Sequence, residues 1–164
     1  MGDGDGHAKR RLVAGVEVSP LSLGGALLGL QEGPAILRLA RASGIKLVDT
    51  SSAYGPSEKT IGASPHEFVV ATKFGNPCEL NGGRHDYSVA HARACLEQSA
   101  SALGGKRIAC LQLHSPPEWP SPVANRELVA ALNGWVREGA IGGWGASVHT
   151  VNGGQIMLDA GATM

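Results

Sequence analysis

Short apolar runs alternate with helical patterns along this chain, and this alternation constrains its fold more than any other feature. The first runs, within 12–19, flank a glycine and predict a β-hairpin. Five later runs predict strands, at 21–29, 45–49, 67–74, 107–114 and 141–148. Helical patterns are expected after them, at 35–42, between Ser57 and Pro65, and at 89–103, 125–138 and 151–159. Such alternation is typical of βα units around a parallel sheet.

Glycine, serine and proline residues mark the expected helix ends. Gly44 is predicted to end the first helix in a left-handed conformation, and Gly104 and Gly139 to end two later ones. Ser57 is a candidate N-cap of the second helix, which Pro65 should stop early. That helix is therefore expected to be short.

The size and charge of the chain limit its classes of function. Its 164 residues, 43% hydrophobic and 17% charged, suffice for one domain with a core, expected over 11–164 after a flexible tail over 1–10. The formal net charge is zero, and no apolar run in the sequence reaches the ~18 residues of a membrane span. We therefore expect a small-molecule partner, with no nucleic acid and no membrane. The first residues lack the apolar segment of a signal peptide, and three cysteines without a disulfide framework favour a reducing cytoplasm.

The cysteines and histidines predict neither disulfides nor a metal site. Cys78, Cys95 and Cys110 are odd in number and show no CxxC spacing, and the histidines show no HxxxH or HExxH spacing. Cys78 is expected to be a passive loop residue, with a reactive thiol as the alternative. Trp119 is a candidate either to line a substrate pocket or to cover one end of the fold.

Four polar residues lie at or just after the ends of three predicted strands. Asp49, Lys73 and His114 lie at strand ends, and Tyr54 follows Asp49 by five residues. If the strands are parallel neighbours, all four side chains gather at one sheet edge, where α/β proteins place their chemistry. Each residue alone has an ordinary structural explanation, such as a turn former or a core histidine. The joint pattern is therefore what indicates a site.

These residue types match the needs of carbonyl reduction by a nicotinamide cofactor. The reaction requires a hydride to carbon, a proton to oxygen and stabilisation of the negative charge on that oxygen. Tyr54 can supply the proton if the ammonium of Lys73 lies beside it. Asp49 is the expected anion for a buried lysine, and His114 can hold the carbonyl oxygen from another side.

Four stretches carry a resemblance to a known family. They are GVEVSPLSLGG at 15–25, VDTSSAYGPSEKTIG at 48–62, VVATKFG at 69–75 and LQLHSP at 111–116. In these stretches, and in their order, the chain resembles the amino-terminal portion of the aldo-keto reductase family of NADP-dependent oxidoreductases.

The resemblance implies an α/β fold of the TIM type, a (β/α)8 barrel, here truncated after about five βα units and preceded by a β-hairpin. It implies reduction of an aldehyde or ketone to an alcohol, or the reverse, with NADPH and a small carbonyl or sugar-like substrate. Tyr54 would be the general acid, Lys73 would tune it, Asp49 would support the lysine, and His114 would orient the carbonyl. Asp49 and Ser147 would bind the cofactor.

The sequence departs from the family pattern in two places. Val148 follows Ser147 where relatives commonly have asparagine, so Ser147 would hold the nicotinamide amide, with His149 as a further candidate. The chain has 164 residues, whereas a closed eight-stranded barrel takes about 250. We therefore expect a fragment with all four catalytic residues but only part of the cofactor site. Its open sheet is expected to be poorly stable.

Other interpretations stay open at this point. The chain could be a non-catalytic remnant of this fold, or a subunit completed by a complementary carboxyl-terminal half or by self-association through open sheet edges. A different fold, an open flavodoxin-like sheet with helices on both faces, is less favoured because of the early hairpin.

Overall fold

A computed structural model describes residues 11–13, 15–117 and 125–164. The tail expected over 1–10 and the loop residue Trp119 lie outside the described residues. Among the described helices, none is both long and apolar enough to cross a membrane.

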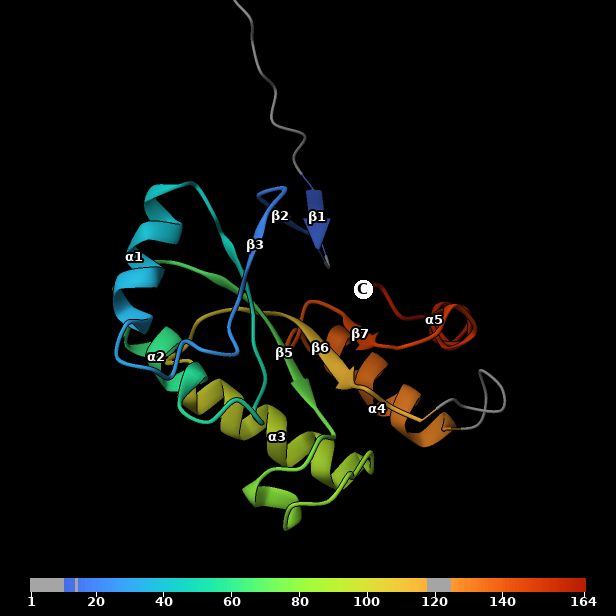
Figure 1. The fold of residues 1–164 in the computed structure, drawn as a ribbon. Coiled ribbons are helices and arrows are strands. Elements are labelled where there is room, and N and C mark those ends of the chain that lie inside the picture. The colour runs from blue at the N-terminus through green and yellow to red at the C-terminus, as the bar shows by residue number, and fades with distance from the viewer. Residues whose placement is uncertain (1–10, 14, 118–124) are drawn as a thin grey trace, which may run out of the picture.

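Five parallel strands form the sheet of this molecule, in the order in which they occur along the chain (Figure 1). They are β3 (Ser22–Gly24), β4 (Leu47–Asp49), β5 (Val69–Phe74), β6 (Ile108–His114) and β7 (Trp144–Ser147). Each strand pairs with the next, as βα units require. The register sets Asp49 beside Ala71, Lys73 beside Gln112 and His114 beside Ser147. The predicted strands are therefore confirmed, with shorter bounds.

The described residues also form five α-helices and one short 3-10 helix. They are α1 (Gly33–Ala42), α2 (Ser57–Ala63), η1 (Glu79–Asn81), α3 (Val89–Ala102), α4 (Arg126–Arg137) and α5 (Val151–Asp159). Gly44, Gly104 and Gly139 follow helices with φ angles of 78°, 60° and 77°, as predicted. Helix α2 ends two residues before Pro65 and is short, also as predicted.

The prediction that Ser57 caps helix α2 is wrong. Pro56 occupies the N-cap position, and Ser57 is the first helical residue. The Ser57 hydroxyl instead donates to the Gly25 carbonyl at 2.7 Å and lies 2.9 Å from Thr50 Oγ1. The Ser57 side chain is therefore hydrogen-bonded to residues distant in the sequence and does not cap its own helix. Through these contacts the buried serine joins α2 to the ends of β3 and β4.

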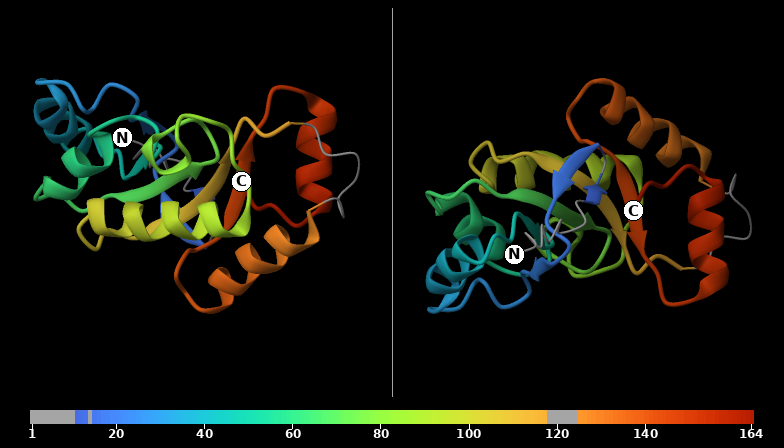
Figure 2. Two further views of the ribbon diagram at one scale, coloured as in Figure 1. Left: turned by 90° about the horizontal axis from the view of Figure 1, so that it is seen from below. Right: turned by 90° about the horizontal axis from the view of Figure 1, so that it is seen from above.

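All five helices pack on one face of the sheet. The larger of two hydrophobic cores contains one residue from each of α1 to α5, namely Leu37, Ile61, Leu96, Leu132 and Met157. The strand residues in that core are Val48, Val70, Phe74, Ile108, Leu111, Leu113 and Trp144. In the views of Figure 2 the helices lie around the outside of the curved sheet. The flavodoxin-like alternative is therefore wrong, and the arrangement is that of a TIM-type barrel truncated after five units.

The predicted hairpin lies at the amino-terminal end of the sheet. Strands β1 (Arg11–Val13) and β2 (Val16–Val18) pair antiparallel. Val18 packs with Leu47, Ala71 and Cys110 in a second, smaller core separate from the helix-facing one. Because side chains alternate along a strand, Ala71 and Cys110 point away from the helices. The hairpin thus covers the inner face of the sheet at the amino ends of its strands.

After α5 the chain returns alongside β7. The Thr163 N–H donates to the Trp144 carbonyl at 2.8 Å, and the Ala146 N–H donates to the Met164 carbonyl at 3.0 Å. A Cβ atom on Gly145 would meet the Met164 carbonyl oxygen at 1.8 Å. Glycine at this position therefore lets the returning backbone approach β7 closely.

Candidate active site

Lys73, which is buried, and Asp49, whose side chain is 37% exposed, form an ion pair at the carboxyl edge of the sheet. Thr72 and Phe74 face the helices, so Lys73 between them points to the inner face, where it is 5% exposed. Its Nζ donates to Asp49 Oδ1 at 2.7 Å and to the Thr50 carbonyl at 2.9 Å. The predicted partnership of these two residues is present in the structure.

Gln112 also contacts the carboxylate of this pair. It lies beside Lys73 in the register of β5 and β6, and its Nε2 donates to Asp49 Oδ1 at 3.3 Å. Asp49 thus receives hydrogen bonds from β5, its neighbour in the sheet, and from β6, the strand beyond it, which fixes its orientation and helps to balance its charge. Sequence inspection did not single out Gln112, although its place two residues before His114 puts it on the same strand face.

Tyr54 lies in the loop between β4 and α2, next to Lys73 and His114. The Tyr54 N–H donates to the Ser51 carbonyl at 3.0 Å, which forms a turn after β4. Lys73 Nζ lies 5.3 Å from the centre of the Tyr54 ring. The Tyr54 and His114 rings meet edge to face, with centroids 5.6 Å apart and an interplanar angle of 88°. The structure therefore brings all four predicted residues together.

The surroundings of His114 favour the neutral form of its imidazole. Burial lowers its pKa, the positive charge of Lys73 lowers it further, and the negative charge of Asp49 opposes that change in part. His114 Nδ1 lies 3.2 Å from the buried Ser51 hydroxyl. If that hydroxyl donates to Nδ1, the proton of the neutral ring lies on Nε2, which is then free to donate to another group.

Tyr87 supports the end of β6 from the loop before α3. Its hydroxyl lies 2.7 Å from the His114 carbonyl and 3.0 Å from the Ser115 carbonyl, and it donates to these acceptors. Its ring packs against Gly75, which has a φ angle of 104° and where a Cβ would lie 2.2 Å from Tyr87 Cε1. Nothing in the sequence pattern points to Tyr87, because the contact depends on how the loop folds back.

Ser147 ends β7 beside His114 in the register of the sheet. Trp144 and Ala146 belong to the helix-facing core, so Ser147 alternates to the inner face, and it is half-buried there. Its carbonyl accepts a hydrogen bond from the Ser115 N–H at 3.0 Å. Val148 packs against the helix-facing core, and His149 is exposed. Ser147 therefore lies on the same sheet face as His114, beside it in the register.

A second polar cluster lies on the helix side of the sheet. Cys78, His91 and Cys95 have ligand atoms within 4.8 Å of one another. The sequence expectation of no metal rested on spacings within one residue type at a time. His91 and Cys95 are four residues apart on α3, a mixed spacing that those patterns do not cover. The spacing of His91 and Cys95 is therefore the sequence feature that could have indicated this cluster.

Comparison with known proteins identifies relatives of this architecture. A family model described as "Aldo/keto reductase family" matches residues 20–162. A protein of Pseudomonas aeruginosa assigned to the aldo-keto reductases is 32% identical with a TM-score of 0.77, over 93% of this chain and 65% of that one. The comparison with curated proteins found no significant match.

Two other solved structures are similar over part of their length. The glycerol dehydrogenase from Gluconobacter oxydans is 25% identical with a TM-score of 0.75, over 94% of this chain and 53% of that one. An aldo-keto reductase from Klebsiella pneumoniae in complex with NADPH shares the fold at 22% identity and a TM-score of 0.71, over 91% and 52%. The chain thus spans roughly half to two thirds of these relatives. Because the family model extends over most of its residues, the chain belongs to the aldo/keto reductase family.

Proposed function

We propose that this chain carries the catalytic part of an oxidoreductase that transfers a hydride between NADPH and an aldehyde or ketone. One observation supports this most directly. Lys73 Nζ lies 2.7 Å from Asp49 Oδ1 and 5.3 Å from the centre of the Tyr54 ring. A buried ammonium that is paired with an anion and lies beside a phenol is suited to assist proton transfer from that phenol.

Tyr54 is the proposed general acid. When a hydride reaches a carbonyl carbon, negative charge develops on oxygen, and a proton from the Tyr54 hydroxyl neutralises it. The ammonium of Lys73 stabilises the phenolate that remains. Asp49 has the supporting role, since a lysine this deeply buried needs an anion beside it to stay charged. In the reverse direction the same phenolate accepts the proton of an alcohol.

His114 is the proposed residue that orients the substrate carbonyl. Its lowered pKa keeps the ring neutral at physiological pH. With Nδ1 accepting from Ser51, the Nε2–H group donates to the carbonyl oxygen and stabilises the charge that forms there. The Tyr54 and His114 rings meet edge to face with centroids 5.6 Å apart, which supports a shared role at one substrate oxygen.

NADPH is the proposed cofactor, and when bound it supplies the hydride. Asp49 and Ser147 are the residues on this chain proposed to hold its nicotinamide end, since they end β4 and β7 at the edge where the other groups gather. The Klebsiella pneumoniae relative of the same fold is in complex with NADPH. The described cysteines are free thiols, which fits the reducing cytoplasm that we propose as the place of action. Cell fractionation checks that location.

We further propose that the chain acts when a complementary carboxyl-terminal half completes its barrel. It spans 51–65% of the length of its structural relatives. Within the described residues, β3 pairs with β4 alone, so its other edge presents backbone groups to a partner. Self-association through that edge is the competing arrangement, and a non-catalytic remnant is the competing function.

Mixing experiments test these proposals together. The chain is assayed for NADPH oxidation with a small aromatic aldehyde, alone and with a separately produced carboxyl-terminal half of a related reductase. We expect turnover in the mixture only, and its loss in Lys73→Met but not in the matched Lys59→Met, which changes an exposed lysine of α2. An inactive mixture of folded halves supports the remnant, and an active dimer of the chain alone supports self-association.

A further inference from the structure

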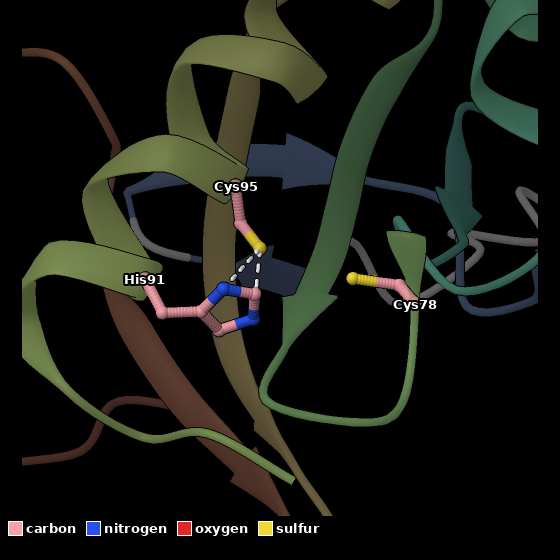
Figure 3. Close-up of side chains that lie close together, drawn as sticks. All are labelled: Cys78, His91 and Cys95. Atoms are coloured by element: carbon pink, nitrogen blue, oxygen red, sulfur yellow. Dashed lines mark hydrogen bonds between the residues drawn. The ribbon is translucent and has the colours of Figure 1, made fainter. Parts of the chain in front are cut away.

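Three residues outside the proposed catalytic site converge between helix α3 and the loop that follows β5. His91 and Cys95 lie one turn apart on α3, and Cys95 Sγ is 3.3 Å from His91 Nε2 and 3.9 Å from His91 Nδ1. Cys78 comes from the loop, and Figure 3 shows its sulfur directed toward the other two side chains. All three ligand atoms lie within 4.8 Å of one another.

The surrounding structure holds these side chains in place. His91 and Cys95 are buried, with exposed fractions of 5% and 0%. Cys78 is fixed through Asn81, whose Oδ1 accepts from the Cys78 N–H at 2.9 Å. Asn81 Nδ2 donates to the Asn76 carbonyl at 2.9 Å and lies 3.4 Å from His91 Nε2. One asparagine thus orders the loop and contacts the imidazole.

The donor set selects for a particular kind of metal ion. Two sulfurs and one imidazole nitrogen suit soft or borderline ions such as Zn²⁺, whereas Mg²⁺ and Ca²⁺ prefer oxygen ligands. Zn–S and Zn–N bonds of about 2.3 and 2.0 Å place tetrahedral ligand atoms about 3.5 to 3.8 Å apart. The observed spacing of up to 4.8 Å therefore needs a closure of about 1 Å. Cys78, half-buried on a loop, is the residue placed to make it.

A cavity lies beside Cys78. This residue lines a cavity of about 390 Å³ together with Ser52, Gly55, Glu79 and Gln98, among others. Water in that cavity can reach a metal bound by the three side chains, which gives the four-coordinate arrangement that Zn²⁺ favours.

We propose that Cys78, His91 and Cys95 form a Zn²⁺ site, completed by a water molecule from this cavity. Binding displaces the protons of both thiols, so each Zn²⁺ taken up releases two protons and forms two Zn–thiolate bonds and one Zn–imidazole bond. No electron transfer takes place. The ion ties the loop after β5 to α3, and this loop carries Tyr87, which holds the end of β6.

The site lies directly behind the proposed catalytic residues. The Ser52 hydroxyl donates to the Lys73 carbonyl at 3.1 Å and also lies 3.9 Å from Cys95 Sγ. Cys95 belongs to the helix-facing core that also contains Val70 and Phe74 of β5, whereas the Lys73 side chain points to the inner face. The role proposed for the ion is therefore to join the loop after β5 to α3, on the other side of β5 from the Lys73 side chain.

Metal titration of the full chain tests this proposal. The protein is stripped of metal, kept under a reductant that does not bind metal, and titrated with Co²⁺, whose thiolate complexes absorb in the near ultraviolet. We expect one Co²⁺ per chain, a thiolate charge-transfer band, and displacement by one equivalent of Zn²⁺ but not by Mg²⁺. Absence of the band, or binding at several equal weak sites, overturns the proposal.

Variants assign the ligands. Cys78→Ser is expected to weaken Zn²⁺ binding more than ~100-fold, because loss of an outer-shell partner alone costs about 10- to 100-fold. Cys110→Ser is the matched control, since Cys110 lies in the small core under the hairpin, and its Zn²⁺ affinity should match the parent. Equal affinity in the Cys78 variant contradicts the site.

A measurement on the unmodified chain makes the test independent of variant folding. Cys78, partly exposed, is alkylated by iodoacetamide and quantified by peptide mass spectrometry. Zn²⁺ should slow its alkylation at least tenfold, and Mg²⁺ should not. An alkylation rate that Zn²⁺ leaves unchanged contradicts coordination by Cys78.

Discussion

The two ends of the sheet differ in what their inward-facing side chains do. At the carboxyl ends of the strands, Asp49, Lys73 and His114 are polar and joined to one another or to loop residues by hydrogen bonds. At the amino ends, Leu47 and Cys110 of the same strands pack under the hairpin residue Val18. Strands of a few residues thus carry apolar packing at one end and chemistry at the other. Substitutions at the two ends should therefore separate stability from activity.

The largest effect is expected at the carboxyl end. Tyr54→Phe removes the proposed proton donor and should lower kcat of the completed enzyme by about 10² to 10⁴-fold. The Tyr54 ring is half-buried and keeps its contact with His114, so the free energy of unfolding should change little. Steady-state kinetics and urea unfolding of the same preparation check both statements. Retained kcat would remove Tyr54 from its proposed role.

The opposite pattern is expected at the amino end. Leu47→Ala leaves a cavity beneath the hairpin and should lower the free energy of unfolding by about 2 to 5 kcal/mol. The folded fraction should retain its turnover number. Leu39→Ala, at a residue 69% exposed on α1, is the control and should be close to neutral. A large loss of turnover in correctly folded Leu47→Ala would show that the two ends are coupled.

A smaller effect on stability is expected at Tyr87, which holds the carboxyl end of β6 next to the proposed catalytic residues. Tyr87→Phe removes one hydrogen bond to the His114 or Ser115 carbonyl and should lower the free energy of unfolding by about 0.5 to 1.5 kcal/mol. The end of β6 should also become more mobile, which hydrogen exchange at the Ser115 amide can measure. Unaltered hydrogen exchange and unaltered stability would show that hydrogen bonds from water replace the Tyr87 hydroxyl at the two carbonyls without loss.

The smallest effect is a pH dependence of stability. The folded pKa of His114 is lowered below its ordinary 6.5, so between these two values the unfolded chain binds more protons than the folded chain. Stability from this group therefore rises with pH through that window and is constant above 6.5. Urea titrations of the parent and of His114→Gln should differ in slope there. Parallel curves would indicate that His114 titrates alike in both states.

Much of the fold could be predicted from the sequence because its signals are local. Each strand of the described sheet lies within an apolar run of the sequence. The helix expected over 151–159 has the same bounds as helix α5. The convergence of Asp49, Lys73 and His114 also followed from local position plus a rule of topology, since parallel strands bring their carboxyl ends to one edge.

The parts that sequence patterns missed depend on contacts between distant segments. A serine before a helix predicts a cap, but Ser57 found the Gly25 carbonyl, 32 residues away. The contact between Tyr87 and His114 spans 27 residues and follows no periodicity. Cys78 reaches His91 and Cys95 only after the loop folds back over α3. In each case a contact with a residue distant in the sequence determined where the side chain lies, and local secondary-structure propensity did not.

The packing of Tyr87 on Gly75 also lets one side chain contact the backbone that follows two neighbouring strands. One side of the ring rests on the backbone that leaves β5, and its hydroxyl reaches the backbone that leaves β6. The ring thus joins the backbone beyond β5 to the backbone beyond β6, just after the last paired residues Phe74 and Leu113. Apart from Cys78 and Asn81, the eleven residues between Gly75 and Tyr87 are then free to vary in sequence without changing this contact.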